Sequence, residues 1–238
     1  IVAQPPAAIA ASAHNHRISR PSAPHLRAPR PPATIAGNEE ALMTEAEKLE
    51  FEIYEKALKL AALRKEEPGV EVKDYAFTTL DGPTSLSTLF AGRDLMMVIH
   101  NMGQACRYCT LWADGINGVL PHLESAMSVV LVSKDPPETQ RRLAQDRGWR
   151  FRMASHGGGA YMTEQSVGDG NYPGAVIYAR DGAKILRRGR ARFGPGDLYS
   201  PLWHFLALAG IGEGEFTPQF HYWSRPQKME DGGANVRD

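Results

Sequence analysis

The stretch HNMGQACRYCTLWADGING, residues 100–118, contains the only two cysteines of the chain, Cys106 and Cys109. They stand directly behind the apolar run DLMMVIH (94–100) and at the start of a segment with helical character. The run predicts a short buried strand, so the pair falls where a strand passes into a helix. A Cys-x-x-Cys at such a junction, among alternating strands and helices, is typical of a thioredoxin-like redox site.

The composition of the 238-residue chain fits one domain with additional segments. Apolar residues make up 42%, enough for a sizeable core, and 27 basic side chains balance 27 acidic ones. This balance gives no electrostatic reason to expect nucleic acid or an anionic membrane as a partner. No apolar stretch reaches the length that spans a bilayer. Two cysteines do not make a disulfide scaffold, so catalysis, metal binding and redox sensing are the roles that they suggest.

The two ends of the chain differ from its middle. Residues 1–43 are rich in Ala and Pro, with four Arg, three His and only two acids, which predicts a disordered leader. Such an acid-poor, Arg- and Ser-bearing segment is compatible with an organelle transit peptide; the alternative is that Met43 is the start. We also expect a disordered tail at 224–238. Because no secretory h-region is present, we expect a cytoplasmic location, with the cysteines mostly reduced.

Residues 44–69 predict an N-terminal helix. Thr44 and Glu47 fit a capping box, and Pro68-Gly69 ends the segment. Its apolar residues recur at helical spacing, opposite the charged ones: Leu49, Ile53, Leu60 and Leu63. We expect this face to pack on the helix's own domain rather than on a partner.

Residues 70–223 predict one α/β domain. Short strands flank a turn at Asp81-Gly82-Pro83 ahead of the strand 94–100, and a helix follows from Ala105, with a kink or break expected at Gly115, Gly118 and Pro121. Further along, strands are predicted at 127–133 and 151–155, a hairpin at 174–190, and helices at 136–148 and 197–210. This order predicts a central mixed sheet flanked by helices, a thioredoxin-like fold whose leading hairpin is peroxiredoxin-type.

The chemistry of a dithiol exchanger assigns different roles to the two cysteines. Cys106 would lie in the first turn of the helix, where backbone N–H groups and the helix dipole lower a thiol pKa. Cys109, one turn later on the same face, can resolve a mixed disulfide formed by Cys106. We expect the charge of Arg107 to stabilise the thiolate further.

Five more residues are candidates for the site, and the first is Tyr108, which lies between the two cysteines. Pro173 precedes the strand 174–180, the place where thioredoxin-like folds carry a cis-proline against the dithiol. Trp112 is expected beside the dithiol or in the core. For Asp114 we favour a cap or salt bridge over a role in proton transfer to Cys109. His156, ahead of three glycines, is a candidate proton donor, although a loop-structural role is commoner; the glycines do not have phosphate-loop spacing.

Other roles for the two thiols stay open. Structural zinc takes four ligands, so His100, His122 or His156 would have to complete the site. A copper-delivery protein could combine the cysteines with Met102 and a histidine, because soft sulfur ligands suit Cu(I). A non-enzymatic redox sensor and a pair of inert, buried cysteines are further alternatives. The peroxidatic pattern P-x-x-x-T-x-x-C of peroxiredoxins is absent, since Ile99 and Gly103 occupy its first two positions ahead of Cys106.

The chain resembles the thioredoxin-like family known as domain of unknown function 899, over residues 44–223. The likeness rests on the block NMGQACRYCTLWADGINGVLPHLE and on VKDYAF, LVSKDPPETQ, RGWRFRMASHGG and RFGPGDLYSPLWHFL. It implies a dithiol-disulfide oxidoreductase with Cys106 and Cys109 as the redox pair, and it implies no particular substrate. From the chemistry of the pair itself we expect a protein or small-molecule thiol or disulfide as substrate, and no cofactor. Arg107-Tyr108 between the cysteines differs from the Gly-Pro of thioredoxin, so thioredoxin's potential and partners do not carry over.

Overall fold

A computed structural model describes residues 43–168 and 170–220. Nearly all of the predicted leader 1–43 and the whole predicted tail 224–238 lie outside these ranges. The chain divides into two compact units, residues 1–57 and 58–238, and the sheet and all helices but the first belong to the second unit.

Helix α2 (Glu45–Glu66) begins as the sequence predicts. The backbone N–H of Thr44 donates to the Glu47 carboxylate (2.7 Å), and the N–H of Glu47 donates to the Thr44 hydroxyl (3.3 Å), which confirms the capping box. None of the helix's residues is buried, in contrast to the packed face that was expected.

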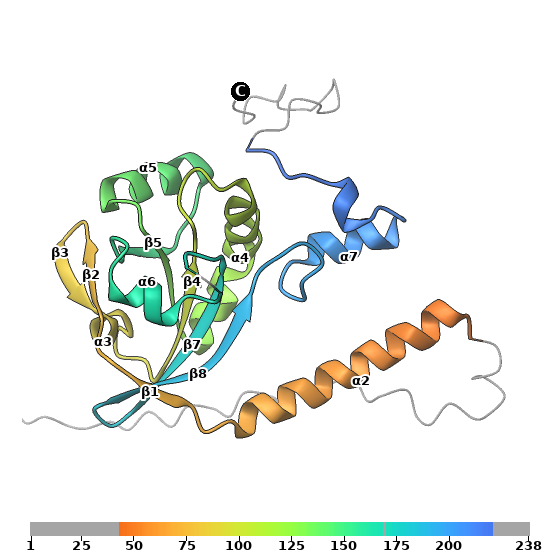
Figure 1. The fold of residues 1–238 in the computed structure, drawn as a ribbon, viewed down its shortest axis with the longest axis horizontal. Coiled ribbons are helices and arrows are strands. Elements are labelled where there is room, and N and C mark those ends of the chain that lie inside the picture. The colour runs from red at the N-terminus through yellow and green to blue at the C-terminus, as the bar shows by residue number, and fades with distance from the viewer. Residues whose placement is uncertain (1–42, 169, 221–238) are drawn as a thin grey trace, which may run out of the picture. The chain divides into compact units, whose positions relative to one another are not determined.

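In the described part of the chain, eight strands form one mixed sheet in the order β1-β8-β7-β4-β5-β6-β2-β3 (Figure 1). The strands β4, β5 and β6 run parallel, and the other pairings are antiparallel. Their bounds are β1 (Val70–Val72), β2 (Ala76–Thr79), β3 (Gly82–Ser85), β4 (Leu95–His100), β5 (Ser128–Ser133), β6 (Arg152–Ser155), β7 (Gly174–Asp181) and β8 (Lys184–Arg192). The central strands are therefore β4 and β5, and β4 leads directly into the cysteine segment.

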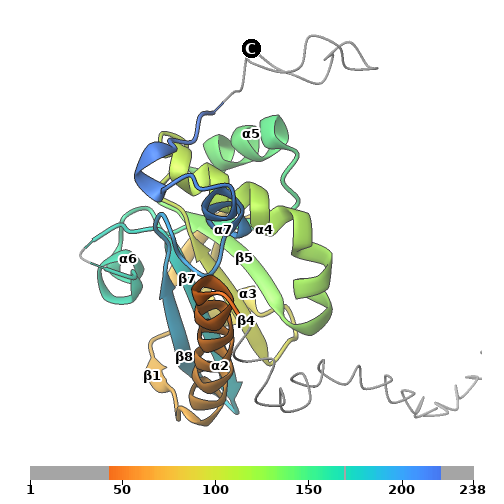
Figure 2. The same cartoon turned by 90° about the vertical axis from the view of Figure 1, so that its right-hand side faces the viewer.

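The helices lie on both faces of this sheet. Figure 1 shows α4 on one side, with α3 and α6 on the other, and Figure 2 shows α7 beside α4. Their bounds are α3 (Leu86–Leu89), α4 (Arg107–Ala126), α5 (Pro137–Arg147), α6 (Ala160–Gln165), α7 (Pro201–Leu208) and the 3-10 helix η1 (Glu213–Glu215). Crossovers through α4 and α5 join the three parallel strands, as parallel pairing requires.

The core divides into two clusters because successive strand residues point to opposite faces. On β4, Val98 packs with the cluster under α3 and α6, whereas Ile99 packs with the cluster under α4. On β5, Val130 and Leu131 divide in the same way. Every residue of β5 is buried, as expected of a strand covered on both sides.

Helix α4 corrects one prediction. The break expected at Gly115, Gly118 and Pro121 is wrong, because the helix runs unbroken from Arg107 to Ala126. An internal proline costs a helix roughly 3 kcal/mol or more. Burial of the helix's inner face offsets this cost; the buried residues include Trp112, Ala113, Ile116 and Leu120.

Four short elements had no counterpart in the sequence prediction. They are β1, which pairs with β8 at one end of the sheet, α3 in a stretch expected to be extended, α6 in the expected Gly-rich loop, and η1. Each is so short that neighbouring parts of the fold, rather than its own residue pattern, decide its conformation. None of the described helices combines the length and apolar character needed to cross a membrane.

The start of β7 requires a glycine. A Cβ atom at Gly174 would collide with the side chain of Val167 and with the backbone oxygen of Ala191. We predict that Gly174→Ala lowers the free energy of unfolding by about 1–3 kcal/mol, the usual cost of overpacking. Chemical denaturation measures this loss. Gly118→Ala is the matched control, since a Cβ there meets nothing within 4 Å; equal stability of the two variants would contradict the packing at Gly174.

Candidate functional site

The loop between β4 and α4 turns tightly before the first cysteine. The N–H of Gly103 donates to the side-chain oxygen of Asn101 (2.8 Å), and the N–H of Cys106 donates to the Gly103 carbonyl (3.1 Å). Gly103 has a φ of +113°, and a Cβ there would lie 2.8 Å from both carboxylate oxygens of Asp135. The carboxylate of Asp135 also accepts the N–H of Gln104 (2.7 Å). A glycine at position 103 therefore lets the loop close against Asp135.

Cys106 is the N-cap of α4. Its backbone is extended (φ −98°, ψ 99°), and its sulfur accepts the N–H of Cys109 at 3.2 Å. An N-cap side chain satisfies one of the amide groups that the first turn of a helix leaves unpaired, usually through an oxygen. Here a sulfur takes that place, so the helix N-terminus points at the atom that would carry a thiolate charge.

The two thiols differ in exposure and in acidity. Cys106 is partly exposed, whereas Cys109 is buried, and both are free thiols in the structure. The hydrogen bond from the Cys109 thiol, with the backbone N–H groups of Cys109 and Tyr108, lowers the pKa of Cys106 from 9.0 to about 6, although burial opposes the shift. The same interaction with Cys106, together with burial, raises the pKa of Cys109 well above its usual value. Near neutral pH, Cys106 is therefore the thiolate and Cys109 the thiol.

Arg107 occupies the first position of α4 and is exposed. Its guanidinium is not among the groups that lower the pKa of Cys106, which are the partner thiol and two backbone amides. The expected electrostatic role of Arg107 stays a prediction.

Met102 contacts both cysteines. Its backbone N–H donates to the sulfur of Cys109 at 3.3 Å, and its thioether sulfur lies 4.0 Å from the sulfur of Cys106. The side chain is 39% exposed, so it lies beside the reactive thiol at the surface. The three sulfur atoms of Met102, Cys106 and Cys109 thus form one cluster.

The segment before β7 approaches this cluster through Asn171, whose amide donates to the carbonyl of Met102 (3.4 Å). Pro173 is two residues further on and buried. The expected cis bond is wrong, because no described peptide bond is cis. The carbonyl of Pro173 accepts the N–H of Phe193 (3.0 Å), which extends the β7–β8 pairing and holds Pro173 in line with the strand.

The aromatic residues after the first cysteine pack into the fold. The ring centroids of Tyr108 and Trp112 lie 6.2 Å apart, and Trp112 is buried and stacks on Phe193 at 5.7 Å. The indole N–H of Trp112 donates to Asp197 (2.9 Å). Asp197 also accepts the backbone N–H groups of Gly194, Tyr199 and Ser200. Trp112 therefore fixes the first turns of α4 to the loop that follows β8.

Asp114 has the structural role that was favoured. Its carboxylate pairs with the guanidinium of Arg147 and accepts the indole N–H of Trp149 (2.7 Å). These contacts join α4 to the end of α5.

The histidines do not join the cysteine pair. Burial lowers the pKa of His156 to about 4 and that of His100 to about 3. The ring of His156 accepts the N–H of Gly158 (3.1 Å), and that of His100 shares a hydrogen bond with the Tyr161 hydroxyl (2.9 Å). His122 is exposed. In residues 43–168 and 170–220, no group of three or more His, Cys, Asp and Glu side chains is arranged to hold a metal.

Two residues of the site were missed by the sequence interpretation. Asp135, just beyond β5, holds the loop ahead of Cys106, and Asp197 anchors Trp112. The segment GPGD (194–197) carried a signal for the second, because Asp commonly accepts backbone N–H groups within turns. Neither contact could be assigned from local sequence, since each joins elements far apart in the chain.

Comparison with family models gives one match over most of the chain. The model described as "Bacterial protein of unknown function (DUF899)" matches residues 35–228. Comparison with curated proteins gave no significant match.

Solved structures of redox proteins resemble the chain at low identity. Reduced Prx3 from Vibrio vulnificus matches at a TM-score of 0.46 and 12% identity, covering 59% of this chain and 97% of that one. A candidate protein disulfide isomerase from Bacteroides thetaiotaomicron matches at 0.43 and 21%, covering 60% and 85%. Peroxidoxin BcpB from Mycobacterium tuberculosis matches at 0.38 and 19%, covering 53% and 82%. All three TM-scores are below 0.5, so these likenesses carry no conclusion about activity or fold family. The central mixed sheet flanked by helices that the sequence predicts is seen in the strand order and the helices of the chain itself.

The acidity of Cys106 gives a direct test of the site. We predict that its alkylation rate in the reduced protein follows a titration with a midpoint near pH 6, because the thiolate reacts and the pKa is lowered to about 6. Iodoacetamide modification followed by mass spectrometry measures the rate at each pH. In Cys109→Ala the midpoint should move upward, because the hydrogen bond from the Cys109 side chain is lost, while Cys106→Ser abolishes the fast phase. A midpoint near 9 in the unmodified chain would contradict the N-cap geometry.

Proposed function

The chain belongs to the family of bacterial proteins of unknown function DUF899, and from that premise we propose that it is a thiol-disulfide oxidoreductase. The observation that carries this proposal is the asymmetric pair: a partly exposed Cys106 of lowered pKa caps α4, and a buried Cys109 of raised pKa lies one turn behind it. A thiol-disulfide exchanger needs two cysteines of different reactivity, because one sulfur attacks the substrate and the other later resolves the mixed disulfide.

The proposed reaction has two displacements. The Cys106 thiolate attacks one sulfur of a disulfide substrate; its S–S bond breaks, a Cys106–substrate disulfide forms, and the departing thiolate takes a proton. Cys109 then loses its proton and attacks the Cys106 sulfur. The mixed disulfide breaks, the second substrate thiol leaves, and a Cys106–Cys109 disulfide forms. The substrate gains two electrons and two protons, and an external thiol reductant returns the pair to the dithiol state.

The first displacement prepares the second through the pKa of Cys109. The interaction with Cys106 is the largest cause that raises this pKa. Once Cys106 is held in a mixed disulfide, its negative charge is gone and Cys109 no longer donates to a thiolate. The backbone N–H of Met102, 3.3 Å from the Cys109 sulfur, then favours the Cys109 thiolate. The resolving cysteine thus becomes a nucleophile only when there is a mixed disulfide to resolve.

Trp112, Asp197 and Asp135 serve this reaction as positioning residues. They hold the first turn of α4 and the loop ahead of it, so that the Cys109 amide and the Met102 amide keep their directions toward the two sulfurs. Pro173 and Asn171 border the same loop from the start of β7, and we assign them to the substrate face. The cytoplasmic location expected from the sequence stays a prediction.

The first test is the reduction potential of the pair. In glutathione buffers, metal-free protein should show a reversible two-electron transition between roughly −270 and −120 mV, the range of known exchangers. Alkylation of the free thiols and mass spectrometry measure the oxidised fraction, and Cys106→Ser is the control without the transition. If no disulfide forms in any buffer, or if the thiols react only after a chelator is added, the proposal fails in favour of inert or metal-binding cysteines.

The second test separates an exchanger from a sensor. With a chromogenic disulfide as substrate and dithiothreitol as reductant, the unmodified chain should turn over above the uncatalysed rate. Mixed with the chromogenic disulfide alone, without dithiothreitol, Cys109→Ser should release one equivalent of thiol and stop. That variant should accumulate a Cys106–substrate mixed disulfide, visible in the intact mass, because the resolving sulfur is absent. Reversible oxidation of the pair without turnover on any disulfide would instead indicate a redox sensor.

A further inference from the structure

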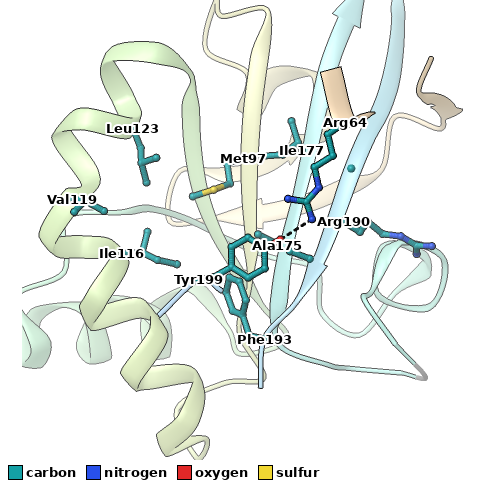
Figure 3. Close-up of a pocket in the computed structure, with 12 residues that line it drawn as sticks. Arg64, Met97, Ile116, Val119, Leu123, Ala175, Ile177, Arg190, Phe193 and Tyr199 are labelled. Carbon is teal, nitrogen blue, oxygen red and sulfur yellow. Dashed lines mark hydrogen bonds between the residues drawn. The ribbon is translucent and has the colours of Figure 1, made fainter. Parts of the chain in front are cut away.

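A hollow of about 310 Å³ opens between α4 and the strands β7 and β8 (Figure 3). It belongs wholly to the compact unit of residues 58–238. Its volume is at the lower end of the range typical of small-molecule sites. The lining is almost entirely apolar, and neither cysteine contributes to it.

The hollow exists because small residues occupy this face of β7 and β8. On the sheet face that it covers, Ala175 pairs with Ala191 and Ile177 pairs with Gly189. A Cβ at Gly189 would meet nothing within 4 Å, and the glycine's backbone is not in the left-handed region. Strand interiors favour β-branched and aromatic residues at such positions. The small residues therefore leave space that the fold itself does not fill.

Helix α4 forms the opposite wall. Ile116, Val119 and Leu123 project from one face of the helix toward the hollow, as Figure 3 shows, and Val119 is 49% exposed. Seven residues of helix rise about 10 Å, which matches an extended chain of roughly eight to ten carbons. Phe193 closes one end of the hollow. The shape suits a narrow aliphatic chain.

The charge around the hollow has one sign. Its two charged lining residues are arginines, Arg64 and Arg190, and no acidic residue lines it. The Arg190 side chain points away from the hollow and donates to the carbonyl of Ser166. The guanidinium of Arg64 reaches over the rim to donate to the hydroxyl of Tyr199 at 2.8 Å. A guanidinium has five N–H donors, so Arg64 can donate to the Tyr199 hydroxyl and also to an anion.

We propose that this hollow binds a medium-chain carboxylate, with the aliphatic chain along Ile116, Val119 and Leu123 and the carboxylate at Arg64. This site is separate from the cysteine pair and does not depend on the proposed redox activity. Phe193, which closes its end, stacks on Trp112 at 5.7 Å with nearly parallel rings. Binding of a ligand in the hollow should therefore change the fluorescence of the Trp112 indole.

The test titrates sodium decanoate, kept below micelle formation, into the full chain, with isothermal calorimetry as the readout. We expect saturable binding of one equivalent. 1-Decanol, which has the same chain without the charge, should bind about fivefold more weakly, as expected for a surface ion pair. Arg64→Gln should remove this difference, and Arg150→Gln, an exposed arginine outside the hollow, should keep it. Equal binding of decanoate and decanol to the unmodified chain would overturn the assignment of Arg64.

The location is tested by filling the hollow. Gly189→Leu should weaken decanoate binding about tenfold or more, because the new side chain takes the space of buried methylene groups. Gly118→Leu, on the exposed side of α4 with nothing within 4 Å, is the matched control. Unchanged binding in Gly189→Leu overturns the proposal. Should that variant not fold, NMR of the Ala175 and Ala191 methyl groups in the unmodified chain decides, since decanoate in the hollow must shift both.

A second copy of the chain is the rival occupant. Sedimentation of the unmodified protein with and without decanoate distinguishes the two. A monomer that binds decanoate supports the proposal. A dimer that Gly189→Leu converts to a monomer, without decanoate binding in either form, overturns it. Running the same titrations on Cys106→Ser keeps this result independent of the redox assignment, because that variant lacks the redox pair and retains the hollow.

Discussion

The hydrogen bond from the Cys109 amide to the Cys106 sulfur is the contact on which the site depends. It makes one atom both the cap of a twenty-residue helix and the proposed nucleophile. A thiolate accepts such a bond better than a thiol, so helix capping and thiolate stabilisation have the same cause. Formation of a disulfide removes the charge from that cap. The start of α4 is therefore coupled to the redox state of the pair.

The rest of α4 keeps this cap in place. Its inner face is buried against the sheet, and the indole of Trp112 is held by Asp197 on one side and by Phe193 on the other. Asp114 and Arg147 join the helix to α5. These contacts do not involve the capping sulfur itself, so the proposed redox reaction would change the cap and leave them in place. The same packing explains how the helix continues through Pro121.

The sequence predicts the features that local periodicity controls. The buried strand before Cys106, the alternation of strands and helices, and the capping box at Thr44 all follow from patterns within a few residues. The Cys-x-x-Cys spacing also predicts which two sulfurs meet. The unbroken course of α4 could not be predicted, because propensity at Pro121 opposes it and only tertiary burial reverses that preference. The backbone hydrogen bond between Pro173 and Phe193 is likewise beyond the reach of local sequence, because the two residues are twenty positions apart.

The electrostatics of the site were the least predictable part. Arg107 is the cation that the sequence suggests for stabilising the thiolate. The groups that lower the pKa of Cys106 are instead the Cys109 thiol and two backbone amides, and backbone amides occur in every sequence. What distinguishes these amides is that they point toward the cysteine sulfurs. Gly103, Asp135 and the packing of Trp112 fix that orientation.

Proton transfer at the site follows from the same geometry. With pKa values lowered to about 3 and 4 by burial, His100 and His156 are uncharged at neutral pH and do not supply a general acid there. Cys109 carries a proton while Cys106 is a thiolate. Cys109 must lose this proton before it can attack the mixed disulfide in the proposed reaction. Because Cys106 is partly exposed, solvent is the proton source that the proposed reaction uses for the departing substrate thiolate. The proposed reaction thus needs only solvent and backbone donors around the pair, and it requires no charged histidine.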